Sequence, residues 1–220
     1  METCKIAVLV SGGGTNLQAL LDAEASGVLR SGTIALVVSN KPGAYALTRA
    51  ENAGVEALTL TRAACGGQEG FEAALNEALE ARGVELIILA GFLSILSAEF
   101  TARWEKRILN VHPSLIPSFC GKGFYGLKVH EAALARGVKY TGATVHYVNQ
   151  IPDGGVILLQ QPVPVLPGDT PEILQRRVME QAEWILLPQA AELVSAKLMS
   201  QSHVSRNTEK HSQLTSFNRF

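Results

Sequence analysis

The chain has 220 residues, of which 47% are hydrophobic, and its formal net charge at pH 7 is −1. That length and apolar content are sufficient for one domain with a sizeable buried core. A nearly neutral chain lacks the broad positive field of nucleic-acid-binding proteins, so an anionic ligand would have to be held by local groups. We therefore expect small-molecule partners and no nucleic acid.

The cysteines and the N-terminal segment bear on the compartment. Cys4, Cys65 and Cys120 cannot all pair with one another and lack metal-ligand spacing, which favours a reducing compartment and predicts no metal. The apolar run at 6–10 is too short for a signal peptide, and no run approaches the roughly 18 apolar residues of a membrane span. We expect a cytoplasmic protein with no membrane partner, either a monomer or a homodimer.

Apolar segments that favour strands alternate with helical patterns through the first half of the chain. Strands are expected at 5–10, 34–39, 56–60, 86–90 and 108–112, and helices at 16–24, 70–82 and 97–104, with a further alanine-rich helix ending at Ala53. Repeated strand–helix–strand units with unbroken apolar strands are typical of a parallel sheet covered on both faces. The expected fold class is therefore α/β and Rossmann-like, with a mostly parallel sheet flanked by helices.

The pattern changes after residue 112. Segments 144–148 and 156–160 predict an antiparallel strand pair, joined by a glycine-containing loop. A long final helix is expected from Pro171, with Thr170 or Asp169 as its N-cap. Beyond Met199 the sequence is polar and shows no periodicity, so residues 200–220 are expected to form a disordered tail after a domain at 1–199.

Three glycines follow the first expected strand, in the sequence Ser-Gly-Gly-Gly-Thr-Asn at 11–16. Glycine lets backbone N–H groups approach an anion closely, and the following helix N-terminus adds partial positive charge. The spacing is not that of a dinucleotide fingerprint, and Gly-Lys-Ser/Thr is missing, so neither an NAD site nor an ATPase loop is supported. The loop is a candidate phosphate site. A tight strand-to-helix turn without a ligand is the alternative.

Asn110 and His112 are two positions apart on an expected strand, so their side chains share a face. They lie at the carboxyl end of a parallel strand, where open α/β sheets bind ligands. A neutral donor for an oxyanion and a titratable imidazole are the groups that acyl transfer requires. Asp153 could lie beside His112 and favour its imidazolium form, although an ordinary turn aspartate is the alternative. His146 is expected to play a supporting role, with Thr144 on its face holding a water or the aspartate loop.

Four segments together carry a family resemblance. They are Ser11-Gly-Gly-Gly-Thr-Asn-Leu-Gln18, Ala90-Gly-Phe-Leu-Ser-Ile-Leu96, Asn110-Val-His-Pro-Ser-Leu-Ile-Pro117, and Gly142-Ala-Thr-Val-His146 leading to Asp153-Gly-Gly155. Over residues 4–198 the chain resembles the phosphoribosylglycinamide formyltransferase family, folate-dependent enzymes of purine (IMP) biosynthesis. The Asn-x-His-Pro-Ser-Leu core is shared with other formyl-transferring and deformylating enzymes, and the glycine loop narrows the resemblance to this family.

The resemblance implies transfer of a formyl group from the co-substrate 10-formyltetrahydrofolate to the amino group of 5-phosphoribosylglycinamide. It implies a catalytic trio of Asn110, His112 and Asp153. The ribonucleotide phosphate would be held by Gly13, Gly14, Thr15 and Asn16, with Glu183 facing the same substrate. The folate would contact Gln68, Leu93, Ser94, Ile95, Leu96, Asn110, Asn149, Gln150, Ile151, Pro152 and Asp153. Ser94 and Gln68 stand where many relatives carry arginine, which leaves the contacts to the folate tail open.

Three alternatives share part of this pattern. A formyltetrahydrofolate deformylase would use the same trio with water as nucleophile, but such enzymes usually carry an extra N-terminal domain, and here the first strand is expected at Lys5. A methionyl-tRNA formyltransferase would need a further C-terminal nucleic-acid-binding domain, where only a short polar tail is expected. A non-enzymatic nucleotide-binding module would use the glycine loop and leave the trio unexplained.

Overall fold

The computed structural model describes the backbone of residues 2–217 and the side chains of residues 2–201. Seven strands form one sheet in the order β3-β2-β1-β4-β5-β6-β7. Their bounds are β1 Cys4–Val10, β2 Gly32–Ser39, β3 Ala57–Thr59, β4 Leu86–Leu89, β5 Ile108–His112, β6 Tyr140–Tyr147 and β7 Ile157–Pro164. The pairs among β1 to β5 are parallel, whereas β5–β6 and β6–β7 are antiparallel. The Rossmann-like α/β class with a C-terminal antiparallel pair is confirmed.

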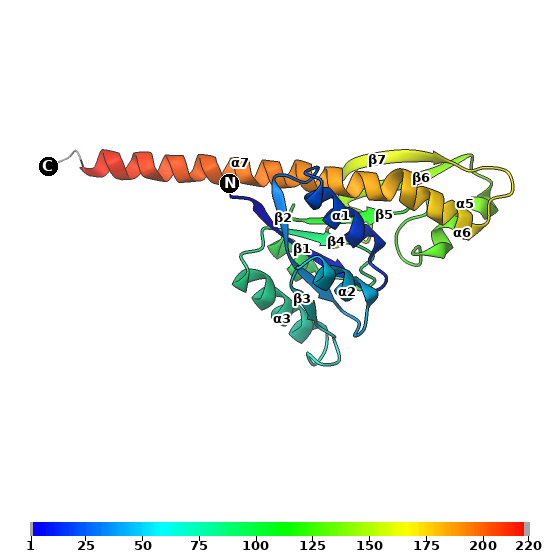
Figure 1. Cartoon of the computed structure of the whole chain (residues 1–220), viewed down its shortest axis with the longest axis horizontal. Coiled ribbons are helices and arrows are strands. Elements are labelled where there is room, and N and C mark those ends of the chain that lie inside the picture. The colour runs from blue at the N-terminus through cyan, green and yellow to red at the C-terminus, as the bar shows by residue number, and fades with distance from the viewer. Residues whose placement is uncertain (1, 218–220) are drawn as a thin grey trace.

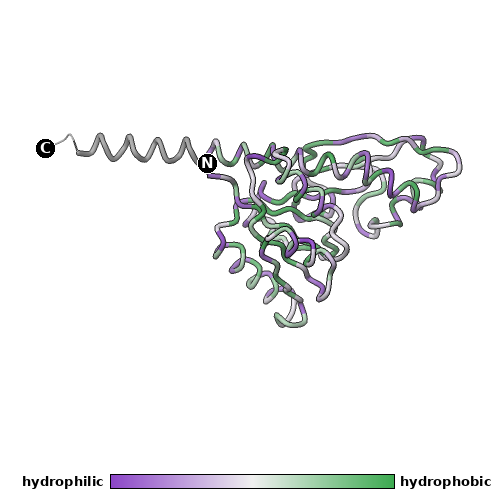
Figure 2. Tube along the Cα trace, in the orientation of Figure 1, coloured by the Kyte–Doolittle hydropathy of each residue, from purple (hydrophilic) through white to green (hydrophobic). Residues whose placement is uncertain are grey.

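Helices cover both faces of the sheet because alternate residues of the central strands point to opposite sides. Ile6 and Val8 of β1 lie in one core cluster with α1 (Thr15–Ala25), α2 (Tyr45–Asn52) and α7 (Trp184–Phe217). Ala7 and Leu9 lie in a second cluster with α3 (Gln68–Ala81) and α4 (Ala98–Arg103). Figure 1 shows α1 and α7 on one side of the sheet and α3 on the other, and Figure 2 shows apolar residues along the central strands. The carboxyl ends of β1, β4 and β5 therefore open at one edge of a rigid core.

The second half of the chain adds the antiparallel strands and α5 (Leu127–Arg136), α6 (Pro171–Val178) and α7. The expected N-cap is confirmed, since Thr170 Oγ1 accepts a hydrogen bond from Ile173 N at 3.3 Å, and Pro171 occupies the first turn. A π-helical turn, η1 (Met179–Glu183), interrupts the expected long helix, and Pro188 lies inside α7. π-Helical turns are frequently associated with functional sites.

Helix α7 continues to Phe217, where the sequence predicted a disordered tail beginning at residue 200. Residues 189–217 contain neither glycine nor proline, so the polar composition does not end the helix. In Figure 1 its last turns extend away from the sheet. The end of the predicted tail, 218–220, lies outside the described residues, and the domain boundary at residue 199 stays a prediction. None of the described helices combines the length and apolarity needed to cross a bilayer.

Candidate active site

The ends of β5 and β6 bring four polar side chains together. The antiparallel register places Asn110 opposite His146 and His112 opposite Thr144. Directly opposed residues of antiparallel strands share a sheet face, so all four point the same way. Thr144 supports a different segment from the expected one: its hydroxyl donates to Ser114 O at 2.7 Å and accepts from Ile116 N at 3.1 Å. Thr144 therefore holds the proline-rich exit of β5 instead of the aspartate loop.

Asp153 lies between the two histidines. Its Oδ2 is 3.5 Å from His112 Nδ1, and its Oδ1 is 3.5 Å from His146 Nε2. Asp153 Oδ2 also accepts a hydrogen bond from Gly121 N at 2.8 Å. Before β7 the loop passes so close to β6 that a Cβ on Gly155 would lie 1.7 Å from Tyr147 O, so only glycine fits there. The structure therefore brings the three residues of the expected catalytic trio together and adds His146.

The surroundings of Asp153 keep its carboxyl group ionised. Burial acts to raise its pKa, but the neighbouring His146 and His112 rings and the Gly121 N–H together lower it below the usual value. An ionised carboxylate can only accept hydrogen bonds, so it can receive an N–H from either ring. Asp153 is thus suited to orient a histidine that gains and loses a proton.

His146 fixes the side-chain amide of Asn110. His146 Nδ1 lies 2.8 Å from Tyr147 O and must carry a proton, since a carbonyl oxygen can only accept. In the neutral ring Nε2 is then an acceptor, and Asn110 Nδ2 donates to it at 3.2 Å. This orientation leaves the second N–H of the Asn110 amide free for a ligand. Protonation of His146 would turn Nε2 into a donor towards Asp153 and remove the acceptor for Asn110.

Both ring nitrogens of His112 face protein groups. Its Nδ1 faces Asp153, and Nε2 donates to Phe119 O at 2.8 Å. Phe119 has a positive φ of 48°, a conformation that costs energy for a bulky side chain. While this hydrogen bond is in place, His112 Nε2 cannot donate to any other group.

His130 is a third imidazole close to His112. The structure buries it completely on α5, and neither ring nitrogen has a partner among the described residues. Burial, and then the proximity of His112, lower its pKa to about 4. His130 is therefore neutral near pH 7, and its spacing from Val129 and Ala133 on the buried face of α5 was the signal for that burial.

The glycine loop connects β1 to α1 and meets η1 at its base. Gly14 has a φ of 73°, and a Cβ there would lie 2.6 Å from Ala46 Cβ. Asn16 Nδ2 donates to Glu183 Oε2 at 2.7 Å, across 167 positions of sequence. Burial raises the pKa of Glu183 to about 7, against the opposing effect of the Asn16 hydrogen bond. The two residues expected to face one substrate are thus in direct contact.

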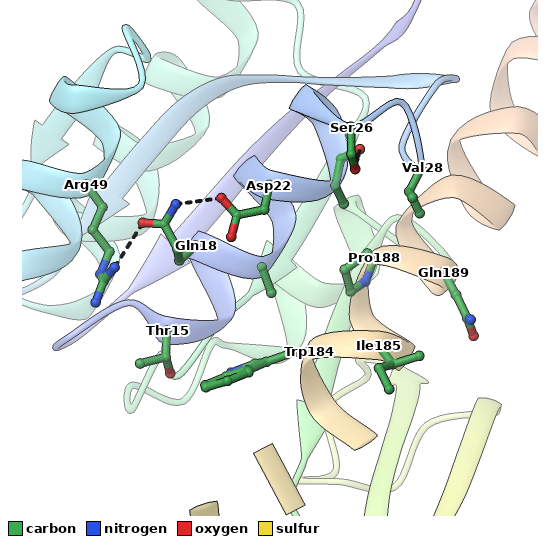
Figure 3. Close-up of a pocket in the computed structure, with 12 residues that line it drawn as sticks. Thr15, Gln18, Asp22, Ser26, Val28, Arg49, Trp184, Ile185, Pro188 and Gln189 are labelled. Carbon is green, nitrogen blue, oxygen red and sulfur yellow. Dashed lines mark hydrogen bonds between the residues drawn. The ribbon is translucent and has the colours of Figure 1, made fainter. Parts of the chain in front are cut away.

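A cavity of about 650 Å³ lies behind this loop, between α1 and α7. Thr15, Gln18 and Arg49 line one side, and Trp184 and Ile185 line the other (Figure 3). None of the expected catalytic trio lines it. The residues of the expected trio instead lie on β5 and in the loop between β6 and β7. No group of His, Cys, Asp and Glu suited to a metal ion occurs among the described residues.

Comparisons with known proteins agree with this geometry. Residues 4–190 match the family model described as formyl transferase. A phosphoribosylglycinamide formyltransferase of Haemophilus influenzae is 42% identical over 177 residues, which are 80% of this chain and 81% of the relative. The chain belongs to the phosphoribosylglycinamide formyltransferase family. The crystal structure of glycinamide ribonucleotide transformylase 1 from Symbiobacterium toebii is 44% identical, with a TM-score of 0.82 over 89% of each chain.

Other members of the wider family are larger. The trifunctional purine biosynthetic protein adenosine-3 of Gallus gallus is 45% identical over 87% of this chain. The chain spans 15% to 19% of the length of such trifunctional relatives. A formyltetrahydrofolate deformylase from Burkholderia mallei is 32% identical, with a TM-score of 0.77, and is matched over 66% of its chain. Formyltetrahydrofolate deformylation is therefore the alternative activity to be tested against formyl transfer.

The 93–96 segment, which was expected to contact folate, is hydrogen-bonded to the glycine loop. Ser11 Oγ donates to Asn40 Oδ1 at 2.7 Å and accepts from Leu93 N at 2.9 Å. Asn40 Nδ2 in turn donates to Ser94 Oγ at 2.6 Å. Leu93 and Ile95 are 59% and 65% exposed. The side chain of Leu96 is instead buried in the core, so this residue could offer a ligand only its backbone.

An exposed arginine lies beside this segment, and sequence reasoning missed it. Arg62 Nη2 donates to Ile95 O at 2.8 Å, and Gln68 Nε2 reaches the same carbonyl at 3.3 Å. Gln68 was expected to occupy an arginine position of the family, and Arg62 brings a guanidinium to the same carbonyl from six positions earlier. Only a cluster of basic residues around position 62 would have indicated an anion-binding role from the sequence. A single arginine is too weak a signal.

Proposed function

We propose that this chain transfers the formyl group of 10-formyltetrahydrofolate to the amino group of 5-phosphoribosylglycinamide, giving formylated ribonucleotide and tetrahydrofolate. The observation that carries the proposal is the convergence of Asn110, His112 and Asp153 at the end of β5. These groups adjoin the strand ends that carry the glycine loop and the 93–96 segment. Phosphate, amine and folate would thus meet at one edge of the sheet.

The residues beside the trio fit a flat, partly apolar co-substrate. Leu93, Ile95 and Ile151 are large apolar side chains that remain mostly exposed. Exposed apolar side chains that flank polar groups are typical of ligand sites. The 149–153 loop is held by its own bonds, with Asn149 Oδ1 accepting from Ile151 N at 2.9 Å. When bound, the co-substrate supplies an activated formyl carbon.

Asn110 would stabilise the negative charge that develops on the formyl oxygen. Its amide is oriented by His146, and the remaining N–H is available at the open face of β5. A donor placed in advance at a developing oxyanion is worth about 3–4 kcal/mol of activation free energy. Because the donor is fixed before the reaction, no reorganisation is needed when the charge appears.

His112 would carry the proton from the attacking amine towards the departing folate nitrogen, directly or through a water. Asp153 orients the ring through its contact with Nδ1. An amine is already a competent nucleophile, so no covalent enzyme intermediate is required. Cys120 is unsuited to that role, because burial and then the Asp153 charge raise the pKa of its thiol.

The setting of the enzyme is part of the same proposal. Cys4, Cys65 and Cys120 are all free thiols, which supports a reducing compartment such as the cytoplasm. Both substrates are small molecules, and we propose that the chain works as a monomer or a homodimer. Sedimentation at assay concentrations distinguishes these two states.

The test is formyl transfer followed by folate absorbance, with and without 5-phosphoribosylglycinamide. Turnover that requires the ribonucleotide supports the transferase activity and the phosphate role of the loop. Folate turnover without ribonucleotide would indicate the deformylase instead, with water as nucleophile at the same trio. The glycine loop would then be a structural turn.

A further inference from the structure

The glycine loop contains no basic residue of its own, although a phosphate carries up to two negative charges. The N-terminus of α1 supplies only a partial positive charge. A full charge reaches the loop from another element: Arg49 of α2 donates through Nε to Gly13 O at 2.8 Å. Arg49 thus contacts the loop through its backbone, from 36 positions along the chain.

Helix α2 holds two successive carbonyl groups of the loop. Ala46 N donates to Gly12 O at 3.1 Å, and Arg49 Nε donates to Gly13 O. In a planar trans peptide the N–H points opposite to the C=O. The N–H groups of Gly13 and Gly14 are therefore turned away from α2 and are left as donors for an anion. The close approach of Ala46 to Gly14 shows how tightly α2 and the loop are packed.

Arg49 is itself held in one orientation. Its Nη1 donates to Gln18 Oε1 at 2.9 Å, and Gln18 Nε2 donates to Asp22 Oδ1 at 2.9 Å. Its guanidinium also stacks on the Tyr45 ring, 4.9 Å from the centroid. Figure 3 shows this chain of side chains running from Arg49 along α1. A planar guanidinium can donate in several fixed directions at once, which a lysine ammonium on a flexible stem cannot reproduce.

We propose that Arg49 is a positioning residue for the ribonucleotide: it orients the Gly13–Gly14 peptide so that its N–H faces the phosphate, and it adds positive charge beside the loop. The inference rests on the proposed function and goes beyond it, because it places a specificity-determining group on α2, outside the glycine loop and the catalytic trio. It also explains why the loop needs no lysine of its own.

The test compares Arg49→Ala and Arg49→Lys with the unmodified chain in steady-state formyl transfer. Both variants are expected to raise the KM for 5-phosphoribosylglycinamide by roughly ten- to a hundredfold, the size of a lost hydrogen bond to a charged group. The kcat at saturating ribonucleotide and the KM for folate are expected to stay nearly unchanged. Equilibrium binding of the dephosphorylated glycinamide riboside is also expected to be unchanged, because it lacks the group that the loop recognises.

Arg82→Ala is the matched control. Arg82 also donates to a backbone carbonyl, Ala78 O at 2.8 Å, and pairs with Glu56, but it lies beyond α3 at the opposite edge of the sheet. Its loss is expected to leave both KM values unchanged. An unmodified chain without ribonucleotide-dependent turnover would overturn the proposed function. With that turnover present, an unchanged ribonucleotide KM in Arg49→Ala, or full recovery in Arg49→Lys, would overturn the role of Arg49.

Discussion

The glycine-loop side of the site and the histidine side differ in how firmly their groups are held. Around the loop the hydrogen bonds are short: 2.8 Å from Arg49 to Gly13 O and 2.7 Å from Asn16 to Glu183. Around Asp153, both histidine contacts are 3.5 Å long. Under the proposed function, the binding groups would be organised in advance, whereas the proton-carrying groups would reach their working geometry only when substrates bind, as is common at catalytic sites.

The largest expected effect comes from removing the proton carrier. His112→Ala is expected to lower kcat by roughly 10²- to 10⁴-fold, the usual contribution of a general acid–base group, with little change in the KM for ribonucleotide. Steady-state kinetics together with ribonucleotide binding separate the two effects. Near-normal turnover in this variant would remove His112 from the mechanism. The histidine side would then only bind ligands, like the glycine-loop side.

Gly14→Ala tests the rigidity of the loop side. Its φ of 73° disfavours any Cβ by about 1–2 kcal/mol, and the added methyl would also collide with Ala46. Thermal unfolding is expected to show a larger loss of stability than in Gly43→Ala, where φ is 69° and nothing lies within 4 Å of the new Cβ. The ribonucleotide KM is expected to rise only in Gly14→Ala. Equal effects in the two variants would contradict the close packing of α2 on the loop.

Glu183→Gln tests how much the buried Glu183 carboxyl group lowers the free energy of unfolding at neutral pH. The pKa of Glu183 is raised from 4.5 to about 7. The stabilisation from its protonated form is therefore complete below about pH 4.5 and is lost as pH rises through about 7. Glutamine stays neutral, so the free energy of unfolding above pH 7 is expected to rise by on the order of 3 kcal/mol, while ribonucleotide binding weakens.

Glu192→Gln is the control with the opposite sign. Burial opposes ionisation of Glu192, but its hydrogen bonds with Ser31 and Arg30 lower its pKa. Its contribution is therefore present above the unfolded pKa and is lost as pH falls through the folded value. Denaturant titrations from pH 5 to 9 are expected to show Glu192→Gln less stable at neutral pH. Matching pH profiles for the two variants would refute the assignment for Glu183.

The smallest expected effect concerns the folate tail. Arg62→Ala is expected to raise the KM for a folate with a glutamate tail by about two- to fivefold, the size of an exposed ion pair, and less at high salt. A folate truncated before its glutamate should show no difference between the variant and the unmodified chain. Arg103→Ala, which removes another exposed arginine, serves as the control. If Arg62→Ala left the KM for the folate with a glutamate tail unchanged from the unmodified chain, Arg62 would not contact the tail.

Local sequence patterns were sufficient to place Asn110 and His112 on one face, because that relation depends only on a two-residue spacing within a strand. The pairing of Asn110 with His146 depends on the register between β5 and β6, which are separated by the 113–139 segment. The long helix was expected from Pro171, but η1, which presents Glu183, has no local signature. Arg49 was missed for a related reason: its role arises from the packing of α2 on the loop, not from any motif around it.

The Ser11 hydroxyl is hydrogen-bonded both to Asn40, which in turn binds Ser94, and to the backbone of Leu93. One hydroxyl therefore connects the glycine loop to the 93–96 segment. A shift of the glycine loop around a phosphate would therefore displace the 93–96 segment, and the reverse. The two substrates would then not bind independently. Whatever factor one ligand imposes on the affinity of the other must be returned equally, because thermodynamic linkage is reciprocal.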